Sequence, residues 1–287
     1  MKNIYLVAKK GFKMISLSTY IFLSIALVLL SINKIKLAYT SLAISAVLAY
    51  YFGIIDTTFT IISIIAFILA LIYQYKRFVI LELSLFVFTL ALFLHFIPGF
   101  NNTKVLDQVY ASAHSAPFTL YFSFDKPLGV FILFILMPFL FVNQTYTKAS
   151  FFKWFLLFLS PFVLLCIPWY FGVIQFEFGF PWWIGYFLFS NLLLVALVEE
   201  AYFRGYLQQR LTQFLNPNLA LILASIAFGL MHYKSGILTI IFASIAGIIY
   251  GLAFRYSKSL WVSVLFHYGL NLTHLVFFTY PFYLKGS

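Results

Sequence analysis

The chain has 287 residues, of which 64% are hydrophobic and only 9% are charged. A soluble globular protein carries about 25% charged residues, so this composition excludes a soluble globule and indicates a polytopic membrane protein. The formal net charge is +11. It does not indicate nucleic-acid binding, because basic residues in the short loops of a membrane protein set its topology and contact lipid head groups. We therefore expect the lipid bilayer as a partner and no nucleic acid.

Apolar runs of the length needed to cross a bilayer recur along the whole chain. A span takes about 20 apolar residues, and on that measure we expect an all-α transmembrane helix bundle of about eight to ten spans. The run at 127–142 is the weakest candidate, since its short length also fits a re-entrant or interfacial segment. The candidate spans are 14–32, 35–54, 57–75, 78–97, 127–142, 151–171, 186–211, 217–233, 237–254 and 260–280.

One long polar interval, residues 98–126, interrupts the apolar runs. We interpret it as an exposed loop because it contains Asn101, Asn102, Asp107, His114 and Asp125. The loop divides the chain into residues 1–126, with N-terminal transmembrane helices, and residues 127–287, with the membrane-embedded helices that carry the polar motifs. No internal repeat or low-complexity linker separates these parts further.

Lysine and arginine are concentrated in alternate loops, which indicates the orientation in the membrane. The loops on one side hold most of the basic residues, so we expect that side to be cytoplasmic. The lysines at positions 2, 9, 10 and 13 then fall on the opposite side. Either the first apolar run does not span, or one early span is miscounted. The basic loops are 33–36, 76–77, 143–153, 212–216 and 255–259.

Cys166 is the only cysteine, and it lies in an apolar run. A single cysteine excludes a disulfide within the chain, and we expect Cys166 to be a small buried side chain. The richness in Ile, Phe and Lys, together with this cysteine usage, favours a bacterial inner membrane.

Charged residues enter an apolar helix at Glu199, Glu200 and Arg204, directly after the uncharged run 184–198. A charge at membrane depth costs about 2.5 to 3.5 kcal/mol on insertion scales, so this stretch indicates a functional site. Glu200 and Arg204 are four residues apart on one helix face, which predicts an ion pair. Glu199 is turned away from that face and is free to line a cavity.

Two more polar pairs follow with the same i, i+4 spacing. Phe228 precedes His232, and the ring is expected to cover the imidazole and fix its rotamer. His267 precedes Asn271 on another predicted helix. His274 continues the His267 face, but we expect a structural role for it.

A turn signal at 216–218 places Glu199 and His232 at a similar depth in the membrane. Asn-Pro-Asn between two apolar runs makes the flanking helices antiparallel neighbours. Glu199 and His232 are nearly equidistant from this turn. We therefore expect Glu199 and His232 to share one site. A tilt of the helix that carries His267 would bring His267 to the same depth.

The order Glu-Glu-x-x-x-Arg, Phe-x-x-x-His and His-x-x-x-Asn resembles the CPBP family, which comprises the CAAX proteases and the bacteriocin-processing enzymes often called Abi proteins. The resemblance covers about residues 182–280. It implies a glutamate-type intramembrane endopeptidase, formerly classed as a metalloprotease. It also implies a membrane-associated protein or peptide as the substrate and no cofactor.

The resemblance also implies a role for each residue of the motifs. Glu199 and His232 would activate a water molecule that attacks the scissile carbonyl, and His267 and Asn271 would stabilise the oxyanion. These roles suit the chemistry, because a carboxylate in a low dielectric is a better base and neutral N–H donors meet a developing negative charge. The supporting residues would be Glu200, Arg204 and Phe228.

Two alternatives stay open. A zinc peptidase could use Glu199, His232 and His267 as ligands, although the chain lacks a His-Glu-x-x-His motif. A transporter or a non-catalytic scaffold, for example in bacteriocin immunity, could use the buried ionisable residues as a proton relay or as structural pins. Prenylated C-termini, bacteriocin leaders, peptide pheromones and sorting-signal tails all fit as substrates of a protease.

Overall fold

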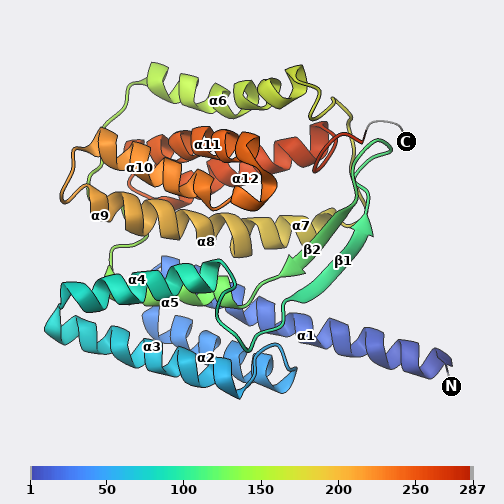
Figure 1. Cartoon of the computed structure of the whole chain (residues 1–287), viewed down its shortest axis with the longest axis vertical. Helices are drawn as coiled ribbons and strands as arrows, with labels where there is room; N and C mark the ends of the chain where they lie inside the picture. The colour runs from blue at the N-terminus through green and yellow to red at the C-terminus, as the bar shows by residue number, and fades with distance from the viewer. Residues whose placement is uncertain (1, 285–287) are drawn as a thin grey trace. The chain divides into compact units, whose positions relative to one another are not determined.

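The computed structural model describes residues 2–284, with side chains from Ser16 onward. It confirms the predicted all-α bundle, and each expected apolar run corresponds to a helical segment (Figure 1). The lysines at positions 2, 9, 10 and 13 have side chains outside the described part. The helices are α1 Lys2–Ser31, α2 Ile35–Tyr51, α3 Thr57–Lys76, α4 Val79–Phe93, α5 Asp125–Leu136, α6 Phe151–Tyr170, α7 Ile184–Ser190, α8 Leu197–Glu200, α9 Gln209–Leu211, α10 Pro217–Leu230, α11 Ile237–Tyr256 and α12 Leu260–Phe277.

Five helical stretches are long and apolar enough to cross a membrane by length and composition. They establish a multi-pass integral membrane protein. Shorter apolar helices occur at Ser16–Ser31, Ile35–Tyr51, Val79–Phe93 and Pro217–Leu230. The five long stretches are Thr57–Lys76, Phe151–Tyr170, Ile184–Leu211, Ile237–Tyr256 and Leu260–Phe277.

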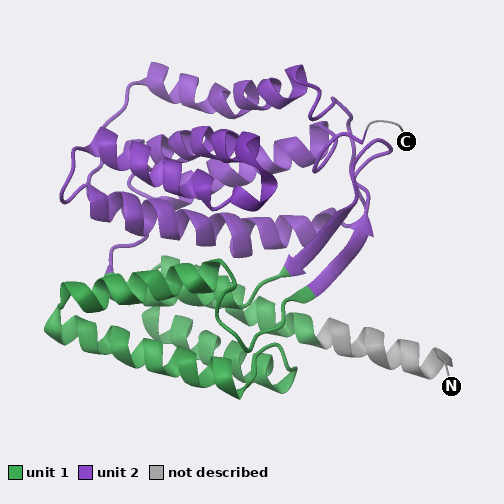
Figure 2. Ribbon diagram, in the orientation of Figure 1, with its two compact units in different colours: residues 1–103, 122–136 green, residues 104–121, 137–287 purple. Residues whose placement is uncertain are grey.

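The chain forms two compact units (Figure 2). Unit 1 comprises residues 1–103 and 122–136, and therefore α1 to α4 together with α5. All residues of α5 except Lys126 are buried, because α1, α3 and α4 pack around it. The run expected at 127–142 is thus a short interior helix that ends at Leu136. The division differs from the predicted boundary near residue 126, since α5 shares its core with the N-terminal helices.

The prediction of an exposed loop over 98–126 is wrong. This interval contains a two-stranded hairpin of β1, Thr103–Val109, and β2, Phe118–Phe122. Both strands are rich in β-branched and aromatic residues, which favour a pleated, half-buried surface. Asp125 also lies outside any loop: it opens α5, it is fully buried, and its Oδ2 lies 2.7 Å from Nδ1 of His95.

Unit 2 comprises residues 104–121 and 137–287. Its central helical stretch is Ile184–Leu211, whose apolar window is 61% buried, compared with 22% for α6. The stretch packs against α10 and α12, and α11 packs against α6, α10 and α12. Because α6 buries only a narrow stripe, Cys166 on that helix is exposed, and the expectation of a buried cysteine is wrong.

The central stretch of unit 2 is not a regular α-helix. A π-helical segment at Asn191–Ala196 precedes the four residues of α8, and a second one at Ala201–Gln208 follows them. A π-turn widens the helix and rotates the side chains after it, and such turns are frequent at functional sites. The two acidic residues of the predicted site therefore lie in a short α-helical segment between two widened ones.

Glycines allow α11 to approach its neighbours closely. A Cβ at Gly247 would lie 3.1 Å from Nη2 of Arg204, and a Cβ at Gly251 would lie 2.7 Å from Oε1 of Gln208. On α10, a Cβ at Gly229 would collide with the Ile240 carbonyl oxygen of α11. Because this Ile240 atom belongs to the backbone, it cannot move aside as the end of a flexible side chain could.

We expect Gly229→Ala to destabilise the protein by about 1 to 3 kcal/mol, because the added methyl group overpacks the contact between α10 and α11. Gly269→Ala on α12 is the matched control: a Cβ there meets no atom within 4 Å, and alanine raises helix propensity by up to about 1 kcal/mol. Thermal unfolding in detergent should therefore shift in opposite directions for the two variants. A Gly229→Ala protein as stable as the Gly269→Ala protein would contradict the close packing.

Candidate active site

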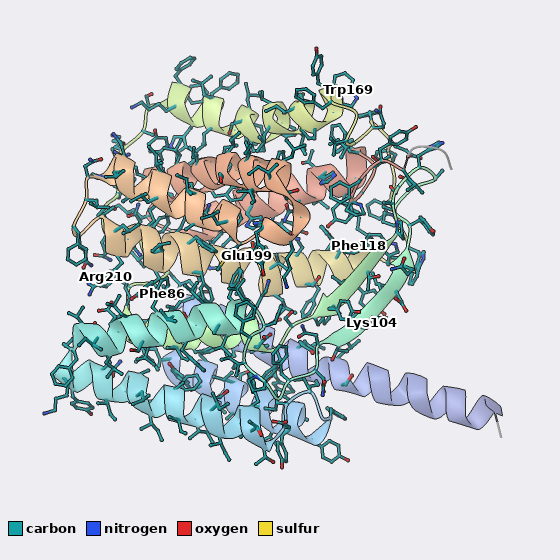
Figure 3. All side chains as sticks on the ribbon, in the orientation of Figure 1. Phe86, Lys104, Phe118, Trp169, Glu199 and Arg210 are labelled. Atoms are coloured by element: carbon teal, nitrogen blue, oxygen red, sulfur yellow. The ribbon has the colours of Figure 1, made fainter. Side chains whose placement is uncertain are left out.

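The first polar motif lies near the middle of the central stretch of unit 2, where Figure 3 labels Glu199. Glu199 is 7% exposed, and Glu200 and Arg204 are fully buried. The predicted ion pair is present, with Nη1 of Arg204 3.2 Å from Oε1 of Glu200. A buried pair needs further hydrogen bonds to offset its desolvation, so the other contacts of both residues determine what this pair does.

Arg204 makes those contacts with two other helices. Its Nη2 donates a hydrogen bond to the carbonyl oxygen of Gly247 at 2.9 Å. Its guanidinium carbon also lies 4.5 Å from the ring centroid of Phe228, which is a close cation–π arrangement. The arginine thus joins α10 and α11 to the central stretch.

Glu200 binds two residues of α12 as well as Arg204. Its Oε1 lies 2.9 Å from Nδ1 of His267, and its Oε2 accepts a hydrogen bond of 2.6 Å from the Ser263 hydroxyl, which is fully buried. Ser263 was not predicted as part of the site, although it precedes His267 by one helical turn on the same face. The structure therefore makes Glu200 the centre of a buried network that links the first motif to the third.

The imidazole of His267 is held by a hydrogen bond at Nδ1 and by a stacked ring on one face. A carboxylate only accepts hydrogen bonds, so Nδ1 carries the proton that is donated to Glu200. Nε2 does not take part in this hydrogen bond. Nε2 lies 4.0 Å from Oε2 of Glu199, and the Tyr250 ring stacks on the imidazole with centroids 4.6 Å apart and planes 10° apart. No sequence pattern indicated Tyr250, because its role depends on how α11 packs against α12.

Phe228 brings the two histidines together. Its ring makes an edge-to-face contact with His232 at 5.1 Å, as the i, i+4 spacing predicted, and a second one with His267 at 5.7 Å. Nδ1 of His232 lies 3.0 Å from the Phe228 carbonyl oxygen, so this nitrogen carries the proton and Nε2 is the potential acceptor. The second motif therefore meets the third around one aromatic ring.

Asn271 is half-buried, and its Nδ2 donates a hydrogen bond of 3.3 Å to Oδ1 of Asn191. Asn191 is 7% exposed and begins the first π-helical segment. It was not predicted, and the only sequence signal is a polar side chain within an apolar run. The pair fixes the orientation of the Asn271 amide, since Oδ1 of Asn191 accepts one of its protons.

The remaining histidines contact residues outside these motifs. His95 binds Asp125 in unit 1, and Nδ1 of His114 lies 3.3 Å from Oε1 of Glu177. His274 makes an edge-to-face contact with the ring of Tyr280. None of these contacts links His95, His114 or His274 to the three motifs.

The donor atoms do not fit a tetrahedral zinc site. Ligand atoms 2.0 to 2.2 Å from such a zinc ion are about 3.4 Å apart, whereas Oε2 of Glu199 and Nε2 of His267 are 4.0 Å apart. Nδ1 of the same imidazole is bonded to Glu200, so only Nε2 could ligate a metal. Within residues 16–284, no group of three or more His, Cys, Asp or Glu side chains is arranged to hold a metal ion.

Removing the arginine should cost more stability than removing most side chains of this size. Arg204→Ala leaves the carboxylate of Glu200 buried without its cation, which typically costs about 3 to 5 kcal/mol. We expect a lower yield and a lower unfolding temperature in detergent. Arg210→Ala is the matched control, because that arginine is partly exposed and forms a hydrogen bond with Gln213 at the end of the same helical stretch. A stable, monodisperse Arg204→Ala protein that has lost only activity would place Arg204 in the chemistry instead.

Residues 181–273 match the family model described as type II CAAX prenyl endopeptidase, Rce1-like. No curated protein and no solved structure matches the chain. The matched residues include all three polar motifs and the helices that bring them together in unit 2. Residues 181–273 are therefore similar to the CAAX-protease (CPBP) family of membrane proteases, as the order of the motifs predicted.

Proposed function

We propose that the protein is a glutamate-type intramembrane endopeptidase that hydrolyses a peptide bond in a membrane-associated protein or peptide. The observation that carries the proposal is the convergence of three motifs from separate helices on one buried site. The Glu199 carboxylate lies 4.0 Å from the His267 imidazole, and Phe228 separates that imidazole from His232.

Glu199 is proposed as the general base, assisted by His232. The 4.0 Å between Oε2 of Glu199 and Nε2 of His267 is too long for a direct hydrogen bond, but one water molecule can bond to both atoms. Glu199 takes a proton from the water as its oxygen attacks the scissile carbonyl. The same proton then passes to the departing amine, so the base is regenerated in each turnover.

His267 and Asn271 are proposed to stabilise the oxyanion. Because Nδ1 of His267 is bonded to Glu200, the imidazole can donate toward the substrate only from Nε2, and it must then be an imidazolium. Glu200 is thus proposed as a positioning residue for His267.

The proposed setting follows from the same features. The substrate is a membrane-associated protein or peptide, because the site lies on helices of membrane-spanning length and apolarity. A bacterial inner membrane is proposed from the amino-acid usage alone. The matching family is named for prenyl endopeptidase activity, and a lipidated C-terminal segment is one substrate of this class.

Glu199→Gln and His232→Ala should each reduce cleavage by about 10² to 10⁴-fold, because each removes a group that handles the proton of the attacking water. Both proteins should insert and unfold like the wild type. The substrate is first found as the membrane protein or peptide that accumulates uncleaved in cells expressing the Glu199→Gln protein, and cleavage is then measured with purified protein. His114→Ala, which alters an exposed histidine bonded to Glu177, is the control and should retain activity. Turnover near the wild-type rate by pure Glu199→Gln protein would refute the assignment.

We propose that catalysis needs no resident metal, so the purified active protein should contain far less than about one equivalent of zinc per chain. A catalytic zinc needs three firm ligands, and the 4.0 Å between Oε2 of Glu199 and Nε2 of His267 is wider than two ligands of one tetrahedral zinc ion. Elemental analysis by mass spectrometry measures the metal content directly. About one zinc per chain, with activity lost on chelation and restored by zinc alone, would establish the zinc mechanism. Inhibition by a chelator without restoration would not, since chelators also perturb lipids and substrates.

A further inference from the structure

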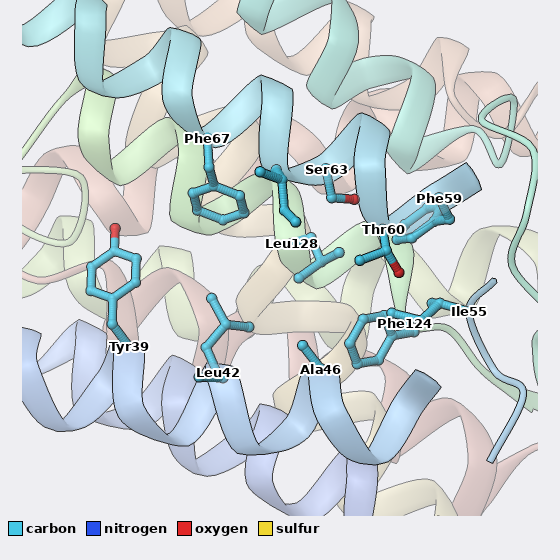
Figure 4. A pocket seen from close by; sticks show the side chains of 12 residues that line it. Tyr39, Leu42, Ala46, Ile55, Phe59, Thr60, Ser63, Phe67, Phe124 and Leu128 are labelled. Atoms are coloured by element: carbon cyan, nitrogen blue, oxygen red, sulfur yellow. The ribbon is translucent and has the colours of Figure 1, made fainter. Parts of the chain in front are cut away.

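An apolar groove lies within unit 1, between α2 and α3 and above α5 (Figure 4). Its volume is about 320 Å³, roughly twice the ~150 Å³ of an apolar protein cavity that stays dry and binds benzene. Phe124 and Leu128 form the floor, and Leu42 of α2 lines one wall. A space of this size and lining favours a hydrocarbon ligand over water.

The groove exists because small side chains face each other across it. Ala43 and Ala46 line it from α2, and Thr60 and Ser63 line it from α3. These side chains are too short to fill the space that the five-residue turn between the two helices leaves open. The polar side-chain atoms of the lining belong to hydroxyl groups, and no charged side chain contributes. The groove itself therefore suits the acyl chain of a lipid rather than its head group.

The groove opens toward the surface that faces lipid. Ile64 lines it and is 54% exposed, and the neighbouring Val47 and Ile61 are 69% and 52% exposed. In a membrane-spanning bundle such exposed apolar side chains contact acyl chains. The occupant available at the mouth of the groove is therefore the hydrocarbon of the bilayer.

A cluster of basic residues lies at one end of the same helix pair. Lys34 and Lys36 stand at the start of α2, and Lys76 and Arg77 stand at the end of α3. Because a short turn joins the two helices and both line one groove, the start of α2 and the end of α3 lie at the same end. All four residues are exposed, and none forms an ion pair within the described part of the chain. Their charges match an anionic head group.

We propose that unit 1 binds one anionic phospholipid, with its phosphate at the basic cluster and one acyl chain in the groove. Tyr39 at the near end of the groove is only three residues beyond Lys36, and Ala46 lies ten residues beyond Lys36. Ten helical residues span about 15 Å, which is the depth of one leaflet of a ~30 Å hydrocarbon core. A lipid anchored at the cluster therefore reaches Ala46 without leaving its leaflet.

The experiment uses the full chain, purified in detergent and titrated with dioleoyl phosphatidylglycerol while thermal unfolding is followed. We expect a saturable rise in the unfolding temperature, and native mass spectrometry should detect about one retained phosphatidylglycerol per chain. Dioleoyl phosphatidylcholine tests the head group. Glycerophosphoglycerol, which has no acyl chains, tests whether the phosphate alone is sufficient. We expect both to stabilise much less.

Variants separate the two parts of the site. Each basic contact contributes roughly fivefold to the affinity for an anionic lipid, so Lys36→Ser/Lys76→Ser should weaken the apparent affinity by more than about tenfold. Ala46→Phe fills the groove and should abolish the saturable stabilisation. Ala46→Leu is the substitute if the larger ring unfolds the protein. Lys148→Ser/Lys153→Ser removes two basic residues of unit 2, one before α6 and one in the first turn of α6, and should bind like the wild type.

Three results would overturn the proposal. Equal stabilisation by the two phospholipids would show a non-specific lipid shell. Equal affinity of the wild type and both groove-filling variants would show that no acyl chain enters the groove. A loss in the Lys148→Ser/Lys153→Ser protein as large as that in Lys36→Ser/Lys76→Ser would show that the overall positive charge, and not this cluster, recruits the lipid.

Discussion

The buried carboxylate of Glu200 is the interaction on which the rest of unit 2 depends. It accepts hydrogen bonds from Arg204, Ser263 and His267, and Arg204 in turn reaches the Gly247 carbonyl of α11. A carboxylate without these donors would not be tolerated at this depth, since each buried ion costs several kcal/mol when it is not compensated. The network therefore determines how the central stretch, α11 and α12 pack, and it fixes the imidazole that faces Glu199.

This arrangement suits the two adjacent acidic residues to different proposed functions. Glu200 has its hydrogen-bonding capacity taken up by fixed donors, so it is suited to hold other groups in place. Glu199 lies at the edge of the network, 4.0 Å from an imidazole nitrogen, and is suited to exchange a proton with a substrate water. Hydrogen-bonded support around a reactive group reduces the reorganisation needed during the reaction. The π-helical segments on either side allow both carboxylates to point into the bundle.

The two compact units differ in which side chains they bury within the membrane protein. Unit 2 buries ionised groups and compensates each of them. Unit 1 buries two acidic residues, Asp125 beside His95 and Glu82 beside the Tyr73 hydroxyl, and it leaves a groove where small side chains face each other. A groove on a membrane protein is filled by whatever surrounds it, so its basic end gives it a preference among lipids.

The sequence alone determined the helical class, the approximate helix positions and the residues of the candidate site. Apolar length and i, i+4 spacing are local properties, so the Glu200–Arg204 pair and the contact of Phe228 with His232 could be predicted. Only the tertiary structure decided that Ser263, Tyr250 and Asn191 support the site, because their contacts join helices far apart in the chain. The hairpin and the buried α5 were missed for a related reason. Polar residues in a short stretch of sequence indicate a loop. Pairing with another strand and enclosure by other helices depend on partners that lie outside that stretch.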